Sequence, residues 1–116
     1  MSISTNTTGR GSKVYPGVLQ SIASSTMTSD YQVLGTFAYP ARVFKITNNS
    51  TEDVTLSWDG TNAHEYIPAG SFLLIDCSSN RQVNDIFSIP LGTTLYVMGT
   101  AGTGNVYLSY YYASSM

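Results

Sequence analysis

The stretch "VTLSWDGTNAHEYIPAG", residues 54–70, decides the fold class of this chain. Its first five residues alternate apolar and hydroxyl side chains, which is the period of a β-strand with one buried face. Asp59-Gly60 follows as a turn signal, and a second short strand over 64–67 ends at Pro68. We predict a hairpin whose polar tip touches a partner. Its expected inward residues are Val54, Leu56 and Trp58, and its expected outward residues are Thr55 and Ser57.

From Asp30 onward the chain repeats this pattern of short apolar runs, separated by turn residues about every 8 to 12 positions. Such spacing is typical of a sandwich or barrel, and no window shows a sustained helical period. We therefore predict an all-β fold, an antiparallel β-sandwich that is a jelly roll or a related Greek key. Further strands are expected at 41–47, 71–77, 85–89, 94–98 and 105–112.

Three connecting or apolar segments give more specific expectations. "NNSTED", residues 48–53, has the side chains of a hairpin loop. "GTAGTG", residues 99–104, lacks the lysine of a phosphate-binding loop and is expected to join the last two strands as a hairpin. "SFLLIDC", residues 71–77, is nearly continuous in apolar side chains, which predicts a strand covered on both faces.

The N-terminal segment differs in composition from the rest of the chain. Residues 1–29 hold twelve Ser or Thr and no acidic residue. A segment of this kind buries too little apolar surface to order itself alone. We predict an extended polar arm over 1–29, with "VYPGVLQSI" (14–22) as its docking point, and a single sandwich domain over 30–116.

Composition excludes several functional classes. Of 116 residues, 42% are hydrophobic and only 10% are charged, so 30 Ser or Thr and nine Tyr cover much of the surface. A Tyr-rich, Lys-poor surface suits contact with other proteins. The net charge of −2, with five scattered basic residues, argues against nucleic-acid binding. The chain has no apolar run long enough for a membrane span and no signal-peptide pattern, so we expect a cytoplasmically made protein without membrane contact.

No group of residues gives a strong signal for a catalytic or metal-binding site. Asp59, His64, Glu65 and Asp76 could be imagined as a metal cluster, but Asp59 belongs to a turn, and His64 and Glu65 would point to opposite faces of a strand. A nucleophilic triad and an acid/base pair lack any signature. Cys77 has no partner for an internal disulfide and is expected to be a small buried hydrophobe. We expect no enzyme activity, no cofactor and no metal.

The tyrosines of the last strand are the strongest candidates for contact. Val106, Leu108 and Tyr110 would share one face, while Tyr107 and Tyr111 face the other. Two outward tyrosines would make an aromatic patch that packs against another subunit or stacks on sugar. The alternative, a strand covered on both faces, has about equal weight at this point.

The chain also resembles small structural proteins of tailed bacteriophage particles, of the capsid decoration or cement type. The resemblance covers residues 41–112 and is carried by "ITNNS", "SWDGT", "IPAGS", "GTTLYV" and "GNVYLSYY". It implies a β-sandwich or jelly roll that assembles with copies of itself, often as a trimer, and binds the major capsid protein or other virion proteins. It supplies no catalytic residues.

The residues and the resemblance together suggest a virion protein that clamps neighbouring capsid subunits and stabilises the assembled shell. The alternatives are a receptor- or carbohydrate-binding module of a tail or head fibre, in which Trp58, Tyr66 or the last tyrosines stack on sugar, and a ring component of the tail or connector. The expected partner-binding residues are Arg10, Lys13, Tyr15, Leu19, Tyr107 and Tyr111.

Overall fold

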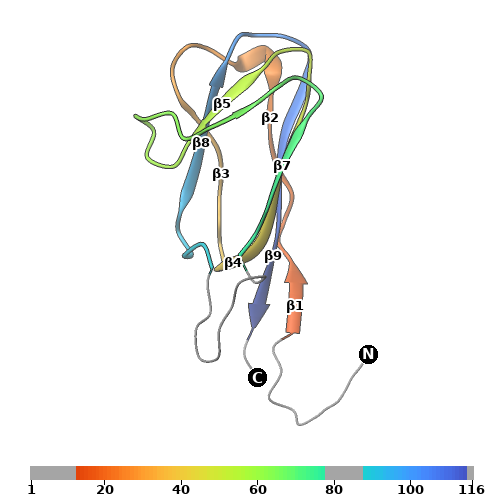
Figure 1. Cartoon of the computed structure of the whole chain (residues 1–116), viewed down its shortest axis with the longest axis vertical. Coiled ribbons are helices and arrows are strands. Elements are labelled where there is room, and N and C mark those ends of the chain that lie inside the picture. The colour runs from red at the N-terminus through yellow and green to blue at the C-terminus, as the bar shows by residue number, and fades with distance from the viewer. Residues whose placement is uncertain (1–12, 78–87, 115–116) are drawn as a thin grey trace.

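Two antiparallel sheets pack face to face in the computed structural model, which describes residues 13–77 and 88–114 (Figure 1). The large sheet has the order β1-β9-β4-β7, with β2 also paired to β9, and the small sheet has the order β3-β8-β5-β6. A short 3-10 helix, η1 (Ser24–Thr26), links β2 to β3. The strands are β1 (Lys13–Pro16), β2 (Gln20–Ala23), β3 (Gln32–Thr36), β4 (Ala41–Ser50), β5 (Val54–Ser57), β6 (Glu65–Ile67), β7 (Phe72–Asp76), β8 (Thr94–Gly99) and β9 (Gly104–Ser114).

The strand pairs are nested in the order of the chain. β2 pairs with β9, β3 with β8, β4 with β7, and β5 with β6. One long double-stranded hairpin would contain these same pairs, and rolling it up adds the contacts β4-β9 and β5-β8 that close the two sheets. This arrangement is a jelly roll. The predicted all-β sandwich is therefore confirmed.

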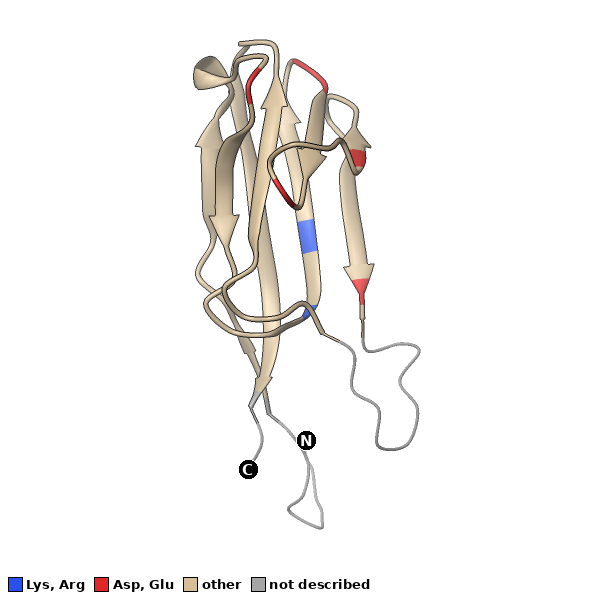
Figure 2. Cartoon of the chain, turned by 90° about the vertical axis from the view of Figure 1, so that its left-hand side faces the viewer, with Lys and Arg blue, Asp and Glu red and all other residues tan. Residues whose placement is uncertain are grey.

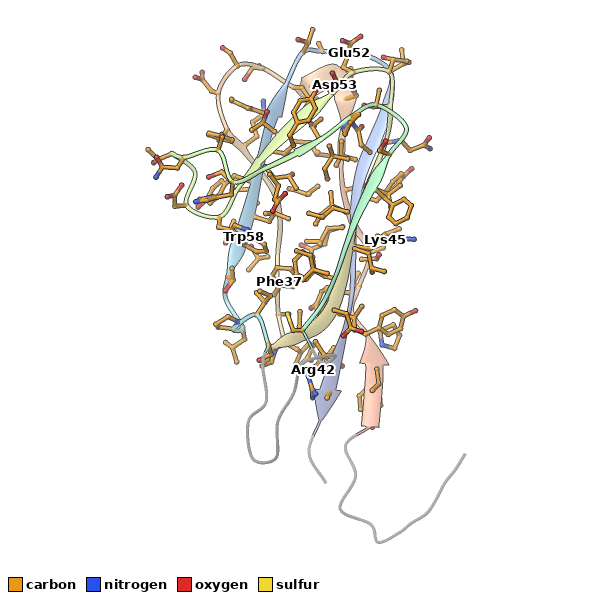
Figure 3. All side chains as sticks on the ribbon, in the orientation of Figure 1. Phe37, Arg42, Lys45, Glu52, Asp53 and Trp58 are labelled. Atoms are coloured by element: carbon orange, nitrogen blue, oxygen red, sulfur yellow. The ribbon has the colours of Figure 1, made fainter. Side chains whose placement is uncertain are left out.

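The core lies between the two sheets and follows the predicted alternation of side chains. In β4 the buried residues include Phe44 and Ile46, and in β9 they are Val106, Leu108 and Tyr110. Phe37, in the connection from β3 to β4, is fully buried between the sheets (Figure 3). Burial of this alternating set holds the inner faces together, since apolar area removed from water is the main stabilising term.

Two connections predicted as hairpin loops are crossovers between the sheets. β4 belongs to the large sheet and extends to Ser50, whereas β5 belongs to the small sheet, so residues 51–53 cross from one layer to the other. The "GTAGTG" stretch likewise takes the chain from β8 in the small sheet to β9 in the large sheet. The predicted hairpin over residues 54–67 is confirmed, because β5 pairs directly with β6.

Three burial predictions were wrong, and the first concerns Cys77, which is only partly buried. β7 is an edge strand whose outward side chains, Phe72 and Leu74, are 63% and 56% exposed, so its apolar run is not covered on both faces. Ser57 is fully buried instead of outward. Its hydroxyl accepts hydrogen bonds from the backbone N–H groups of Asp59 and Gly60, which draws it into the turn that follows β5.

The structure also differs from the predicted N-terminal arm. β1 and β2 pair with successive halves of β9, so residues 13–16 and 20–23 are strands of the large sheet. The physical reason is the length of β9, whose backbone groups need partners along both halves. Residues 1–12 lie outside the described residues, as do 85–87 of the strand predicted at 85–89. Of that strand, Ile89 forms a bridge with Ala41.

Candidate functional site

The most extensive surface feature is the side of the large sheet that faces away from the core, called here the outer face. The register aligns Tyr111 with Val43 and Tyr107 with Thr47 across β9 and β4, and Thr47 with Phe72 across β4 and β7. Side chains at these positions alternate with the buried ones, as the pleat requires. The outer face consists of Val14, Pro16, Val43, Lys45, Thr47, Phe72, Leu74, Asp76, Tyr107, Ser109 and Tyr111.

The outer face combines exposed apolar side chains with two charged residues, Lys45 and Asp76. Val14, Phe72, Leu74 and Tyr111 are all exposed large hydrophobic side chains. Lys45 stands near the middle, and its ammonium group lies 5.8 Å from the centroid of the Phe72 ring, a cation–π geometry. Figure 3 shows Lys45 pointing away from the core, and Figure 2 shows the described acidic residues mostly in loops and at strand ends. Several exposed aromatic and aliphatic side chains on one side of a sheet are typical of a surface that contacts another protein.

Tyr107 and Tyr111 lie on this face, which confirms the predicted alternation along β9. Tyr111 is 49% exposed and Tyr107 is partly buried. The open alternative, in which both faces of β9 are covered, does not hold at Tyr111. Phe72 and Leu74 were missed, because their apolar run was interpreted as a fully buried strand. Strand order decides their exposure, and the sequence does not reveal strand order.

The other predicted contact residues are spread over different places. Leu19 is exposed in the link between β1 and β2. Tyr15 is paired with Tyr112 across β1 and β9, on the opposite side of the sheet from Tyr111. For Lys13 the structure gives only a backbone position, opposite Ser114 in the register. Arg10 lies outside the described residues. Of the predicted contact residues whose side chains are described, Tyr107 and Tyr111 share the outer face, while Tyr15 and Leu19 lie elsewhere.

Tyrosines stack at the end of the large sheet where β1 and β9 meet. The rings of Tyr39 and Tyr112 are stacked with centroids 4.1 Å apart, and Tyr15 lies 5.6 Å from Tyr112. Burial, together with the neighbouring tyrosines, raises the pKa of Tyr112. These rings extend the aromatic surface beyond the core and close the end of the sandwich.

The turn after β5 uses its acidic side chain to hold the backbone. Both carboxylate oxygens of Asp59 accept hydrogen bonds, one from the backbone N–H groups of Thr61 and Asn62, and the other from the side-chain amide of Asn62, each at 2.8 Å. The Ser57 hydroxyl donates a further bond at 2.9 Å. These bonds hold the pKa of Asp59 well below its usual range. The carboxylate is therefore engaged in the turn.

The remaining members of the imagined metal cluster are also separated. The Nδ1 atom of His64 accepts a hydrogen bond from the backbone N–H of Trp58 at 3.0 Å, and Asp76 lies at the end of β7 in the other sheet. Within residues 13–77 and 88–114, no three His, Cys, Asp or Glu side chains are grouped so that they could hold a metal ion.

Two further residues have structural roles. The Asp53 carboxylate accepts hydrogen bonds from the Tyr66 hydroxyl and from the backbone N–H of Ala69, which lower its pKa. The half-buried ring of Trp58 stacks on Phe37 and meets Phe44 edge to face. Trp58 thus packs on the core, whereas Tyr66 is held through its hydroxyl and keeps an exposed ring. The carbohydrate-binding alternative, in which these rings stack on sugar, stays a prediction.

Comparison with known proteins adds one likeness. No family model and no curated protein matches this chain. Among solved structures, it is similar to a chain from Bacillus endospore appendages, a family of disulfide-linked pili, with 13% identity and a TM-score of 0.47 over 99% of this chain and 100% of that chain. Similarity at this level carries no argument about function. No helix in the described part of the chain is long and apolar enough to cross a membrane.

Proposed function

We propose that the protein is a non-enzymatic structural subunit that works by binding other protein subunits through the outer face of its large sheet. In the specific form of the proposal, it is a decoration or cement protein that covers an assembled phage head. The observation that carries the proposal is the outer face itself, where Phe72, Leu74 and Tyr111 are exposed on one side of the large sheet. The sequence resemblance to small phage virion proteins supports the specific form.

A preformed sheet lowers the entropic cost of binding. Covering exposed aromatic and aliphatic side chains there costs no further backbone entropy, because strand pairing already fixes the backbone. Tyrosine is enriched in the buried centre of interfaces, and Lys and Glu are depleted there. A shell that presents its binding surface only after assembly would be stabilised by the free energy of binding this protein.

Binding to head shells tests the proposal, with one variant on each sheet. Tyr111→Glu puts a charge on the outer face, and Val33→Glu makes a similar change at an exposed position of the small sheet. We expect Tyr111→Glu to weaken cosedimentation with assembled shells at least about tenfold, and Val33→Glu to leave it unchanged. Equal binding by all three proteins contradicts the role of the outer face. If wild-type protein binds no shell, the specific form is wrong.

A further inference from the structure

Strand β7 is an edge of the large sheet, and no described segment of the chain covers it. Within the described residues, β7 ends the sheet order and pairs only with β4. Figure 2 shows it as the outermost strand on the right of the molecule. Natural sheets usually protect such edges with charges, prolines, bulges or covering segments, because an unpaired edge is a template for another strand.

The hydrogen-bond pattern tells which backbone groups of β7 point outward. The N–H of Asn48 donates to the carbonyl of Ser71 at 2.8 Å, and the N–H of Cys77 donates to the carbonyl of Arg42 at 2.7 Å. In an antiparallel ladder, positions alternate between those bonded to the neighbour and those turned away from it. Ser71, Leu73, Ile75 and Cys77 therefore bond to β4, while the N–H and C=O groups of Phe72 and Leu74 point to the open edge.

Three of the other edge strands, β3, β6 and β1, carry features that hinder pairing with a further strand. At β3, the side-chain amide of Gln20 bonds to both the N–H and the carbonyl of Thr36, at 2.9 Å each. β6 is only three residues long, and the Asp53 carboxylate bonds to Tyr66 within it and to Ala69 after it. β1 ends at a proline, which has no N–H to donate. Among the described strands, β7 thus stands out as an apolar edge with outward backbone groups.

We infer that β7 pairs antiparallel with β7 of a second copy of this chain, about a two-fold axis at Leu74, so that two large sheets form one continuous sheet. In this register all five residues of β7 pair with the five residues of β7 in the second copy. It lets the outward backbone groups of Leu74 bond to those of the same residue in the other copy. The inference deepens the proposed function by naming a partner, and it rests on that function for its biological meaning.

Most of the side chains that meet across this register are apolar, and the exception is Phe72, which faces Asp76 of the second copy. On the outer face, Leu74 contacts Leu74 of the second copy. On the inner side, Leu73 faces Ile75 of the second copy, and both of these residues are partly buried against the core. Apolar cross-strand pairs on both faces are the contacts that stabilise a sheet. Because such a symmetric contact closes on itself, it gives a dimer instead of a growing fibre.

Sedimentation equilibrium tests the pairing in the full-length protein, from about 10 µM to about 1 mM, a range that covers weak complexes. We expect the mass to rise from 12.5 kDa to twice that value. Leu74→Pro removes an outward N–H, and Leu74→Lys adds an edge charge, so both should remain monomeric with unchanged circular dichroism. Val33 is 54% exposed on β3, whose edge Gln20 partly occupies, so the Val33→Lys variant should still form dimers. A trimer, or dimers of Leu74→Pro, would overturn the pairing.

A cysteine cross-link tests the register itself. The two-fold axis at Leu74 places Ser71 opposite Cys77 of the second copy in a non-hydrogen-bonded pair, whose Cα atoms lie about 4.5 Å apart, within disulfide range. Within one chain the same residues lie roughly 20 Å apart along the strand, too far to join. We expect Ser71→Cys to give at least about tenfold more disulfide dimer than Phe72→Cys, which faces a different residue. Equal yields would overturn the register.

The two proposals can fail separately. A wild-type mass of 12.5 kDa at every concentration overturns the β7 pairing and leaves binding through Tyr111 to be judged by shell cosedimentation. If dimers form and shells are not bound, the pairing stands and the specific form of the proposed function fails.

Discussion

Phe37 is the residue on which most aromatic contacts of the core converge. It is fully buried, and its ring contacts Phe44, Trp58 and Tyr110 at centroid distances of 5.6, 6.3 and 5.0 Å. Phe37→Ala should lower the free energy of unfolding by about 3–5 kcal/mol, because it removes apolar area and leaves a cavity. Urea denaturation measures this loss. A change within about 0.5 kcal/mol, as for an ordinary surface substitution, would contradict the packing.

Asn48 is a buried polar residue that ties the two sheets together. Its side-chain amide donates to the carbonyls of Glu52 and Ile67 at 2.9 and 3.0 Å, and its oxygen accepts from the Ser50 hydroxyl. Asn48→Ala should cost about 1–3 kcal/mol, since it removes three hydrogen bonds, of which the one to the Ile67 carbonyl is buried. The exposed neighbour provides a control, and Asn49→Ala should change the urea midpoint little. Equal effects of the two variants would refute this role.

The Asp59 carboxylate predicts how stability depends on pH. Hydrogen bonds from Asn62, Thr61 and Ser57 depress its folded-state pKa below the ordinary value of 3.8. Its contribution is therefore complete above that ordinary value and is lost as pH falls below it. We expect the urea midpoint of the wild type to fall more steeply than that of Asp59→Asn from about pH 4.5 downward. Parallel pH profiles would show that the turn does not depend on the charge.

At the scale of the elements, the start of β9 depends on a glycine. Gly104 has a φ of 95°, and a Cβ built there would lie 2.2 Å from the carbonyl oxygen of Asn49. Gly70 has a φ of 76° with open space around it, so it shares the strained backbone without the clash. Gly70→Ala should cost about 1 kcal/mol and Gly104→Ala clearly more, measured by thermal unfolding. If the two variants lose similar amounts of stability, the positive φ explains both losses and the contact with Asn49 contributes nothing.

Which side chains of a strand are buried could be predicted from the sequence, but how the strands connect and pair could not. The alternation of Phe44 with Lys45, or of Leu108 with Ser109, reflects a local period of two that any strand with one buried face must have. The same turn chemistry serves a hairpin and a crossover, so residues 48–53 and 99–104 could not be told from hairpins. Ser57 was misplaced because its hydrogen bonds to the following turn outweigh the alternation.

At the scale of the whole molecule, the candidate surface was only half predictable. Tyr107 and Tyr111 follow from the alternation within β9, but the exposure of Phe72 and Leu74 depends on β7 being the end of a sheet. That position is set by pairing with β4, whose residues lie about 30 positions away in the chain. The outer face and the open edge therefore cannot be identified until the strand order of the jelly roll is known.

We propose that this protein is a structural component of a phage head, and the most direct test is its copy number in purified particles of a phage whose genome carries this sequence, measured by quantitative mass spectrometry. The proposed function predicts a fixed ratio to the major shell protein that survives repeated gradient purification. Absence from the particle, or a trace amount that varies between preparations, would contradict it.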